Sequence, residues 1–241
     1  MIDKTIRGLN EAISIISDGA TVLVSGFGEA GNPTELVHAL IDHGVRDLTV
    51  VNNNAGNGHV GLAALIEAGR VEKMICSFPR SSASEVFETM YQQGRVKLEV
   101  IPQGTLAERL RAAGAGLGGF YTKTTIGTPL ARDKERRTYK GEEFVLEEPL
   151  EADFALVKAD TGDRWGNLTY RMSARNFGPV MCMAAKITIV QVRKLIPLGD
   201  IPPENVVTPG IFVDRIVEVP DPVSERAMIE CGFVYEPSET A

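Results

Sequence analysis

The sequence has few of the residues that build metal or redox sites. Its 241 residues include three cysteines, three histidines and one tryptophan. No C-x-x-C or H-x-x-x-H spacing occurs, so we expect no metal site. An odd number of cysteines without metal-ligand spacing favours buried, reduced thiols and therefore a cytoplasmic protein.

Basic charge and long apolar runs are also scarce. Lysine and arginine total 25 against 32 aspartate and glutamate residues, a net charge of −7. This balance argues against a nucleic acid or an anionic membrane surface as partner. No apolar run approaches the roughly 20 residues that cross a bilayer, and the first twelve residues lack the apolar core of a signal peptide. We expect a cytoplasmic protein without a membrane span.

The first half of the chain alternates short apolar strands with helices. Pro33 and Gly44 are typical of the first position and the end of one such helix. Strands that are short, apolar and β-branched, separated by single helices, predict an α/β fold with an open, mostly parallel sheet covered on both faces. The expected strands are 21–25, 48–51, 73–77 and 97–101.

Three more local patterns predict helices. Apolar residues with helical spacing predict a helix from Ile6 to Ile16. Two capping boxes predict helix starts, one at Ser82 with Glu85 and one at Thr105 with Glu108.

The second half is less regular. Residues 136–148 are charged and predict a β-hairpin insertion that turns at Lys140 and Gly141. Residues 153–159 and 186–192 are typical of buried strands, and the tail from about residue 217 looks irregular. Because no linker or repeat interrupts the chain, we expect a single domain over 1–241.

Four polar or glycine-rich loops follow the first four strands. Right-handed crossovers bring the carboxyl ends of parallel strands to one edge of a sheet, where such folds bind ligands. One of these loops alone is ordinary turn chemistry; four together predict a ligand site. The loops are 25–33, 52–58, 78–80 and 102–104.

The first loop contains the spacing G-x-G-x-x-G at Gly26, Gly28 and Gly31. A dinucleotide site also needs an acidic residue at the end of the second strand to bind the ribose. Here that strand ends in three asparagines, and Pro33 removes one amide from the anion cradle. NAD binding is therefore disfavoured, which leaves a tight strand-to-helix turn or close approach by another ligand.

Uncharged amides gather in the other loops. Asn52, Asn53, Asn54 and Gln103 could orient a carbonyl group or stabilise an oxyanion. Asparagine also tolerates turn geometry, so a purely structural role remains open.

Several other residues point to no specific chemistry. The three histidines are interpreted as surface or packing residues, and Trp165 as a packed aromatic in a turn. Residues 114–119 are either a flexible connection or a loop against a ligand. Arg175 could bind a carboxylate or phosphate, or form a structural ion pair. Which of Arg80, Arg171 and Arg175 contacts a substrate carboxylate stays open.

The loop from Ser25 to Pro33 resembles the first signature of family I coenzyme A transferases, Gly-Gly-Phe followed by Gly-x-Pro. Ser25 stands where that pattern has a glycine. The resemblance covers nearly the whole chain and is closest to the family's α subunit. Further matching segments are Asn-Asn-Ala-Gly (53–56), Pro-Gln-Gly-Thr-Leu-Ala-Glu-Arg (102–109), Gly-Ala-Gly-Leu-Gly-Gly-Phe-Tyr-Thr (114–122), Gly-Asn-Leu-Thr-Tyr-Arg (166–171) and Ser-Ala-Arg-Asn-Phe (173–177).

The resemblance implies covalent catalysis by a glutamate that attacks the acyl-CoA thioester and carries CoA as an enzyme thioester. In the family this glutamate lies in a Ser-Glu-Asn-Gly motif, which this sequence lacks. It is therefore expected on a separate β subunit, in an α₂β₂ assembly, with coenzyme A as substrate and no further cofactor.

The resemblance also assigns roles to residues of this chain. Asn53 would donate to the oxyanion, and Gln103 would lie against the glutamate. The residues implied to contact coenzyme A are Ser25, Gly26, Phe27, Gly28, Glu29, Ala30 and Gly31.

Residues 76–80 and 163–171 resemble most the transferases that move CoA from succinyl-CoA to 3-oxoadipate. Three alternatives stay open: an acetoacetate-using transferase, a sugar-phosphate isomerase of related fold, and a non-catalytic CoA-binding protein.

Overall fold

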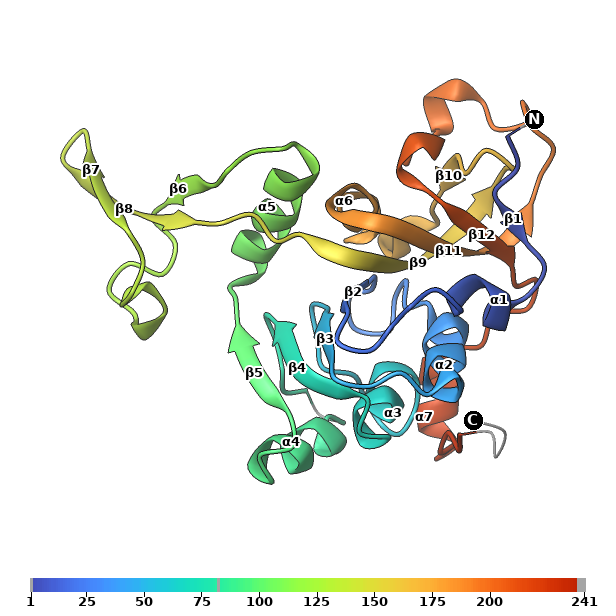
Figure 1. The fold of residues 1–241 in the computed structure, drawn as a ribbon, viewed down its shortest axis with the longest axis horizontal. Helices are drawn as coiled ribbons and strands as arrows, with labels where there is room; N and C mark the ends of the chain where they lie inside the picture. The colour runs from blue at the N-terminus through green and yellow to red at the C-terminus, as the bar shows by residue number, and fades with distance from the viewer. Residues whose placement is uncertain (1, 82, 238–241) are drawn as a thin grey trace.

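A computed structural model describes residues 2–81 and 83–237 and consists of one large sheet, its helices and a projecting arm (Figure 1). Within the described residues the sheet has nine strands, eight of which are parallel. The parallel order is β1 (Thr5–Ile6), β12 (Arg215–Glu218), β11 (Ala185–Leu195), β9 (Ala152–Gly162), β2 (Thr21–Val24), β3 (Leu48–Val51), β4 (Val71–Cys76) and β5 (Lys97–Val100). The ninth strand, β10 (Leu168–Thr169), pairs antiparallel with β9.

Helices cover both faces of the sheet. One apolar cluster packs four helices on the first face: α1 (Leu9–Ile13), α2 (Thr34–His43), α3 (Gly61–Glu67) and α4 (Glu85–Gln92). The second cluster packs α5 (Gln103–Gly114) and α6 (Gly178–Ala184) on the opposite face. The remaining helical segments are α7 (Glu225–Glu230) and four short 3₁₀ turns, η1 (Pro129–Ala131), η2 (Met172–Arg175), η3 (Pro203–Asn205) and η4 (Gly210–Phe212). The predicted parallel α/β sheet with helices on both faces is confirmed.

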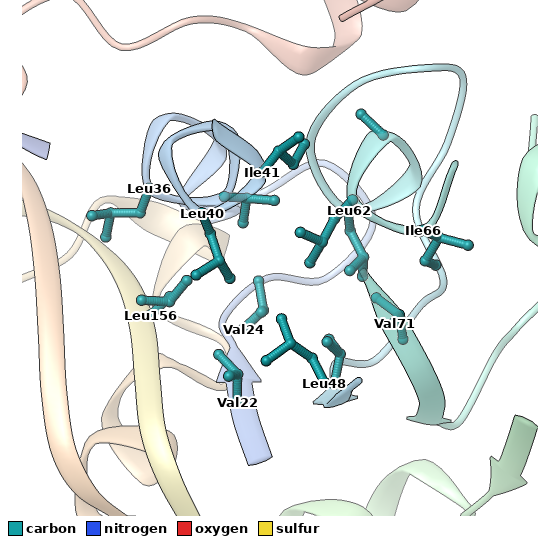
Figure 2. Close-up of a cluster of buried hydrophobic side chains, with 14 of the residues drawn as sticks. Val22, Val24, Leu36, Leu40, Ile41, Leu48, Leu62, Ile66, Val71 and Leu156 are labelled. Carbon is teal, nitrogen blue, oxygen red and sulfur yellow. The ribbon is translucent and has the colours of Figure 1, made fainter. Parts of the chain in front are cut away.

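The alternation of side chains along β2 shows how the sheet serves two cores. Val22 and Val24 belong to the first cluster, and Leu23 between them belongs to the second. Figure 2 shows Val22 and Val24 with Leu40 of α2 and Leu156 of β9. Burying one such side chain contributes about 1.5–3 kcal/mol, so this central strand is held firmly from both faces.

The arm is a separate three-stranded antiparallel sheet that projects from the body (Figure 1). Its strands are β6 (Phe120–Thr122), β8 (Glu142–Glu147) and β7 (Arg136–Tyr139), in that order. Lys140 and Gly141 both have left-handed φ angles, 51° and 79°, which match the two-residue turn of a hairpin. The hairpin predicted within 136–148 is therefore confirmed.

Two predicted helix starts are wrong. Ile6 pairs with Val217 in the sheet, so the first helix begins only at Leu9. The helix expected from Thr105 begins at Gln103, directly after Pro102, and the buried Thr105 hydroxyl has no hydrogen-bond partner among the described residues. The capping box expected at Ser82 lies outside the described residues.

Two side chains are more exposed than expected. Cys76 and Cys182 are buried, and desolvation raises the pKa of each thiol to about 12. Cys231, however, is exposed, because it follows the short surface helix α7. Trp165 lies in a turn as expected but is 44 % exposed rather than packed. In the described part of the chain, no helix is long and apolar enough to cross a membrane.

The end of the chain folds back onto α2. Tyr235 stacks on His38 with ring centroids 3.8 Å apart, and its hydroxyl donates to Asp42. Burial lowers the pKa of His38 to about 4, so its neutral ring accepts a hydrogen bond from Gly61 N–H. His38 is thus a packing residue, as the sequence predicted for it.

Candidate active site at the carboxyl edge of the sheet

The loops after β2, β3, β4 and β5 meet at the carboxyl edge of the sheet. Asn53 Oδ1 accepts hydrogen bonds from Ser77 Oγ at 2.6 Å and from Gln103 Nε2 at 2.8 Å. Asn54 Oδ1 accepts from the backbone N–H of Gly28 at 2.9 Å. The predicted convergence of the four loops is therefore confirmed. We call the side chains of Asn53, Asn54, Ser77 and Gln103 the amide cluster.

Asn53 is the centre of this cluster and is 1 % exposed. Its Nδ2 donates one hydrogen bond to Asn54 Oδ1 at 3.0 Å. A primary amide has two N–H groups, so the second has no partner among the described residues. The two donors to Oδ1 fix the plane of the amide, and this second N–H is thus held in one direction.

The three consecutive asparagines make different hydrogen bonds and have different roles. Asn52 Nδ2 donates to the carbonyl of Val24 at 2.8 Å, and its Oδ1 accepts from the backbone N–H of Asn54 at 2.7 Å. Asn52 therefore joins the β3 loop to the end of β2 and has a structural role. The sequence could not separate it from Asn53, since the distinction depends on which side chain points along the sheet and which points out of its edge.

The loop of residues 25–33, here the glycine loop, is folded tightly on itself. Ser25 Oγ donates to the carbonyl of Gly31 at 2.7 Å, and Phe27 and Ala30 exchange two backbone hydrogen bonds. Gly26 has a φ of 130°, and a Cβ there would lie 1.6 Å from Asn32 Oδ1. The glycine spacing serves this compact turn, and the loop brings Gly28 against the amide cluster.

The remaining predicted contact residues lie on the outer part of this loop. Phe27 is 48 % exposed, so its ring is open to a ligand or a partner. Glu29 and Ala30 line a surface pocket together with Lys158 of β9. The structure thus places the predicted segment 25–31 at the carboxyl edge, where Gly28 contacts the amide cluster.

Sequence reasoning missed Glu225, which fixes the glycine loop from the other end of the chain. Its Oε2 accepts from Asn32 Nδ2 at 2.6 Å and its Oε1 from Thr34 Oγ1 at 2.7 Å. A Cβ on Gly61, whose φ is 51°, would lie 2.2 Å from Oε1, so a side chain there would be strained and would displace the carboxylate. Burial raises the pKa of the Glu225 carboxyl. No sequence pattern indicated this contact, because the residues involved are more than 190 positions apart.

The amide cluster offers hydrogen bonds but no nucleophilic carboxylate. Among the described residues, no acidic side chain hydrogen-bonds to Asn53 or Gln103. The same residues contain no group of three histidine, cysteine, aspartate or glutamate side chains that could hold a metal ion. The arrangement can bind an oxygen that gains negative charge.

Residues 7–219 match the family model described as coenzyme A transferase. The chain belongs to the coenzyme A transferase family. It is 57 % identical over 219 residues to the A-type subunit of the 3-oxoadipate CoA-transferase of Pseudomonas putida, covering 91 % of this chain and 95 % of that one. It is 43 % identical over 214 residues to the A-type subunit of a probable succinyl-CoA:3-ketoacid coenzyme A transferase of Bacillus subtilis, covering 89 % of each chain.

Solved structures share the fold of this transferase chain. Glutaconate coenzyme A-transferase from Acidaminococcus fermentans has a TM-score of 0.80 at 21 % identity and matches 90 % of this chain and 76 % of its own. An acyl-CoA transferase from E. coli O157:H7 has a TM-score of 0.78 at 23 % identity; 92 % of this chain matches 48 % of that chain. At these identities the likeness concerns the fold alone.

The amide cluster and the glycine loop lie within the residues that match the transferase family, and Glu225 lies six residues beyond them. The other segments that the sequence left open contribute less to this edge. Residues 114–119 connect α5 to the arm, and Arg175 is exposed in η2.

Proposed function

We propose that this chain is the α subunit of a cytoplasmic α₂β₂ transferase that moves CoA from succinyl-CoA to a 3-oxo acid, with 3-oxoadipate as the preferred acceptor. The observation that carries this proposal is the amide cluster. It presents a fixed N–H donor at Asn53 and an exposed amide at Gln103, with no acidic partner among the described residues. Such a site supports a reaction whose nucleophile is supplied by a second subunit.

In this proposal the partner's glutamate attacks the thioester carbonyl of succinyl-CoA. The carbonyl oxygen gains negative charge and accepts a hydrogen bond from the second N–H of Asn53. Collapse of this adduct breaks the C–S bond and gives an acyl-glutamyl anhydride and the CoA thiolate. The thiolate attacks the glutamyl carbonyl, releases succinate and leaves CoA on the enzyme; the acceptor carboxylate then reverses these steps.

The amide cluster suits this chemistry because it does not titrate. A neutral donor stabilises each oxyanion without protonating the thiolate or the carboxylates that react. Gln103 hydrogen-bonds to Asn53 through Nε2, which leaves its second N–H to donate to the incoming glutamate carboxylate and orient it. The glycine loop, residues 25–31, would contact coenzyme A through bare backbone.

The choice of acceptor rests on similarity. The relatives from Pseudomonas putida and Acinetobacter baylyi, each 57 % identical, are named for 3-oxoadipate. The alternative is an acetoacetate-type acceptor, supported by relatives at 40–47 % identity that are named for succinyl-CoA and 3-ketoacids.

The test is a steady-state assay of the chain alone and of the chain co-purified with its β subunit, with succinyl-CoA as donor. We expect turnover only from the complex, and a kcat/KM for 3-oxoadipate at least tenfold above that for acetoacetate. Turnover by the isolated chain would refute the divided site. A higher kcat/KM for acetoacetate would replace 3-oxoadipate by the alternative acceptor.

A further inference from the structure

A cavity of about 470 Å³ lies at the same edge of the sheet, on the other side of the glycine loop from the amide cluster. None of the four side chains of the amide cluster lines it. We call it the cationic cavity. The residues that define it here are Ala30, Gly31, Lys158, Asp160, Arg171 and Arg193.

The charges of this cavity do not cancel. Arg193 Nε and Asp160 Oδ1 form an ion pair at 2.9 Å, which neutralises both. Lys158 and Arg171 form no ion pair with any described residue. Glu225 interacts with Lys158 at longer range, but its carboxyl oxygens are already bound to Asn32 and Thr34. Two positive side chains therefore face one cavity in a chain whose net charge is −7.

The backbone fixes both cationic residues. Lys158 lies in β9, and its N–H donates to Ser25 Oγ at the base of the glycine loop at 3.1 Å. Arg171 is preceded by Tyr170, whose hydroxyl is hydrogen-bonded to Thr208 Oγ1 at 2.9 Å. It is followed by Met172, which is 83 % exposed and has a left-handed φ of 50°.

A non-glycine residue in this conformation stores strain, and such strain concentrates at functional sites. Here it turns the chain directly after Arg171.

The segment that carries Arg171 packs against the glycine loop. Asn176 Nδ2 donates to the carbonyl of Ala30 at 2.8 Å. A Cβ on Gly31 would lie 2.6 Å from the carbonyl oxygen of Ala174, so only glycine allows this approach. The cationic cavity and the amide cluster are thus joined through one loop, as two parts of one site would be.

We propose that the cationic cavity binds the distal carboxylate of the dicarboxylic acyl group, with Arg171 as its main contact and Lys158 as the second. The proposal rests on the proposed function, in which the succinyl group and the 3-oxoadipyl group occupy the site in turn. Both end in a carboxylate, so one cationic site serves both half-reactions. A guanidinium binds a carboxylate through two parallel hydrogen bonds, and the flexible Lys158 accommodates the difference in acyl length.

The structure favours Arg171 over the other two arginines near this edge. The side chain of Arg80 is 78 % exposed and lies 3.5 Å from Glu88, with which it pairs. Arg171 and Arg175 are both exposed, but only Arg171 lines the cavity. The volume of the cavity falls within the range of about 300–1,000 Å³ that is usual for small-molecule sites.

The test compares Arg171→Gln with wild type in the complex with the β subunit. The acceptors are 3-oxoadipate and 3-oxohexanoate, which has the same carbon chain but no distal carboxylate. In a ping-pong reaction the kcat/KM of each substrate reports only its own half-reaction. We expect Arg171→Gln to lower kcat/KM at least tenfold for 3-oxoadipate and for succinyl-CoA, and less than twofold for 3-oxohexanoate.

Matched variants separate charge from structure. Arg175→Gln, four residues away and outside the cavity, is expected to leave all three values within twofold. Arg171→Lys should restore part of the loss, and Lys158→Gln should reproduce a smaller loss if Arg171→Gln does not fold. An equal fall for both acceptors would overturn the proposal in favour of a structural role. A fall for succinyl-CoA alone would overturn it in favour of a phosphate of coenzyme A.

A binding measurement keeps the proposal independent of the acceptor assignment. Adipate and hexanoate are titrated calorimetrically into the wild-type and Arg171→Gln complexes. Adipate should bind wild type at least tenfold more tightly than hexanoate, and Arg171→Gln should remove that difference. Absence of the difference in wild type overturns the cationic cavity, whereas its presence without transfer to 3-oxoadipate overturns only the proposed acceptor.

Discussion

The two sides of the glycine loop present opposite kinds of surface at one sheet edge. On the side of β3 to β5, the amide cluster is neutral, and its centre, Asn53, is buried. On the side of β9 and β11, the cationic cavity is open and lined by charged side chains. A neutral, rigid donor suits charge that appears only in the transition state, whereas a permanent cation suits charge that the substrate always carries. Under the two proposals, the edge therefore separates catalysis from recognition.

The largest effect is expected from a substitution in the amide cluster alone. Asn53→Ala in the complex with the β subunit should lower kcat by about 10²–10³, the usual cost of one oxyanion donor. KM for 3-oxoadipate should change little, because the cationic cavity is intact. The measurement is steady-state kinetics together with a melting temperature. Asn10→Ala, on the exposed part of α1, is the matched control and should retain wild-type kcat. An Asn53→Ala variant with full turnover would remove Asn53 from the oxyanion role.

The two sides also differ in how far the sequence could predict them. The neutral side was predictable, because consecutive loops of parallel strands converge, and Asn53 lies in the loop after β3 while Gln103 begins the helix after β5. The cationic side was predictable only as a choice among three arginines. Lys158 and Arg171 become neighbours only through the long strand β9 and the return of the chain after β10. Glu225 was equally hidden, since its helix has six residues and no apolar pattern that predicts a docking site.

The next largest effect is expected from a substitution that disrupts the contact between the glycine loop and the segment that carries Arg171. Gly31→Ala places a methyl group against the carbonyl of Ala174 and forces alanine to a φ of 83°. We expect the free energy of unfolding to fall by about 3 kcal/mol, from backbone strain and overpacking together. Gly19→Ala is the control, since its φ is 74° but nothing lies within 4 Å of the added methyl. It should cost only about 1–2 kcal/mol in the same denaturant titration, and equal losses would show that the contact with Ala174 contributes nothing.

A smaller effect is expected from loosening the glycine loop through Glu225, which belongs to neither side but interacts with Lys158 at longer range. Glu225→Ala leaves the donors of Asn32 and Thr34 unpaired, so kcat/KM for succinyl-CoA should fall about tenfold, in line with the 1–3 kcal/mol cost of unpaired buried donors. Glu225→Gln keeps an acceptor for Asn32 and should stay within threefold of wild type. Glu230→Gln, exposed on the same helix, should match wild type in this assay. A tenfold loss in Glu225→Gln would assign the effect to charge rather than to loop position.

The raised pKa of Glu225 predicts that the stability of the chain depends on pH, and the Glu225→Gln variant tests this prediction. Burial is the main cause that raises the pKa of Glu225, and nearby Glu29 raises it further, while Asn32, Thr34 and Lys158 lower it. The folded chain then binds the proton more tightly than the unfolded chain, so this group costs stability as pH rises above the ordinary glutamate range. The melting temperature of Glu225→Gln relative to wild type should therefore increase from pH 5 to pH 8. A constant difference would show that the carboxyl is not destabilised by burial.

The smallest effect is expected from salt, which weakens binding at the cationic cavity but does not act on the neutral amide cluster. Salt screens exposed charges, with a Debye length of about 10 Å at 0.1 M and about 3 Å at 1 M, whereas a buried neutral donor has no charge to screen. Raising ionic strength from 0.05 to 0.5 M should therefore lower kcat/KM for 3-oxoadipate about threefold and leave kcat unchanged. The value for 3-oxohexanoate should move less, since only its reacting carboxylate is charged. If both acceptors lose equally, salt acts on the reacting end, and the distal carboxylate is not held by Lys158 and Arg171.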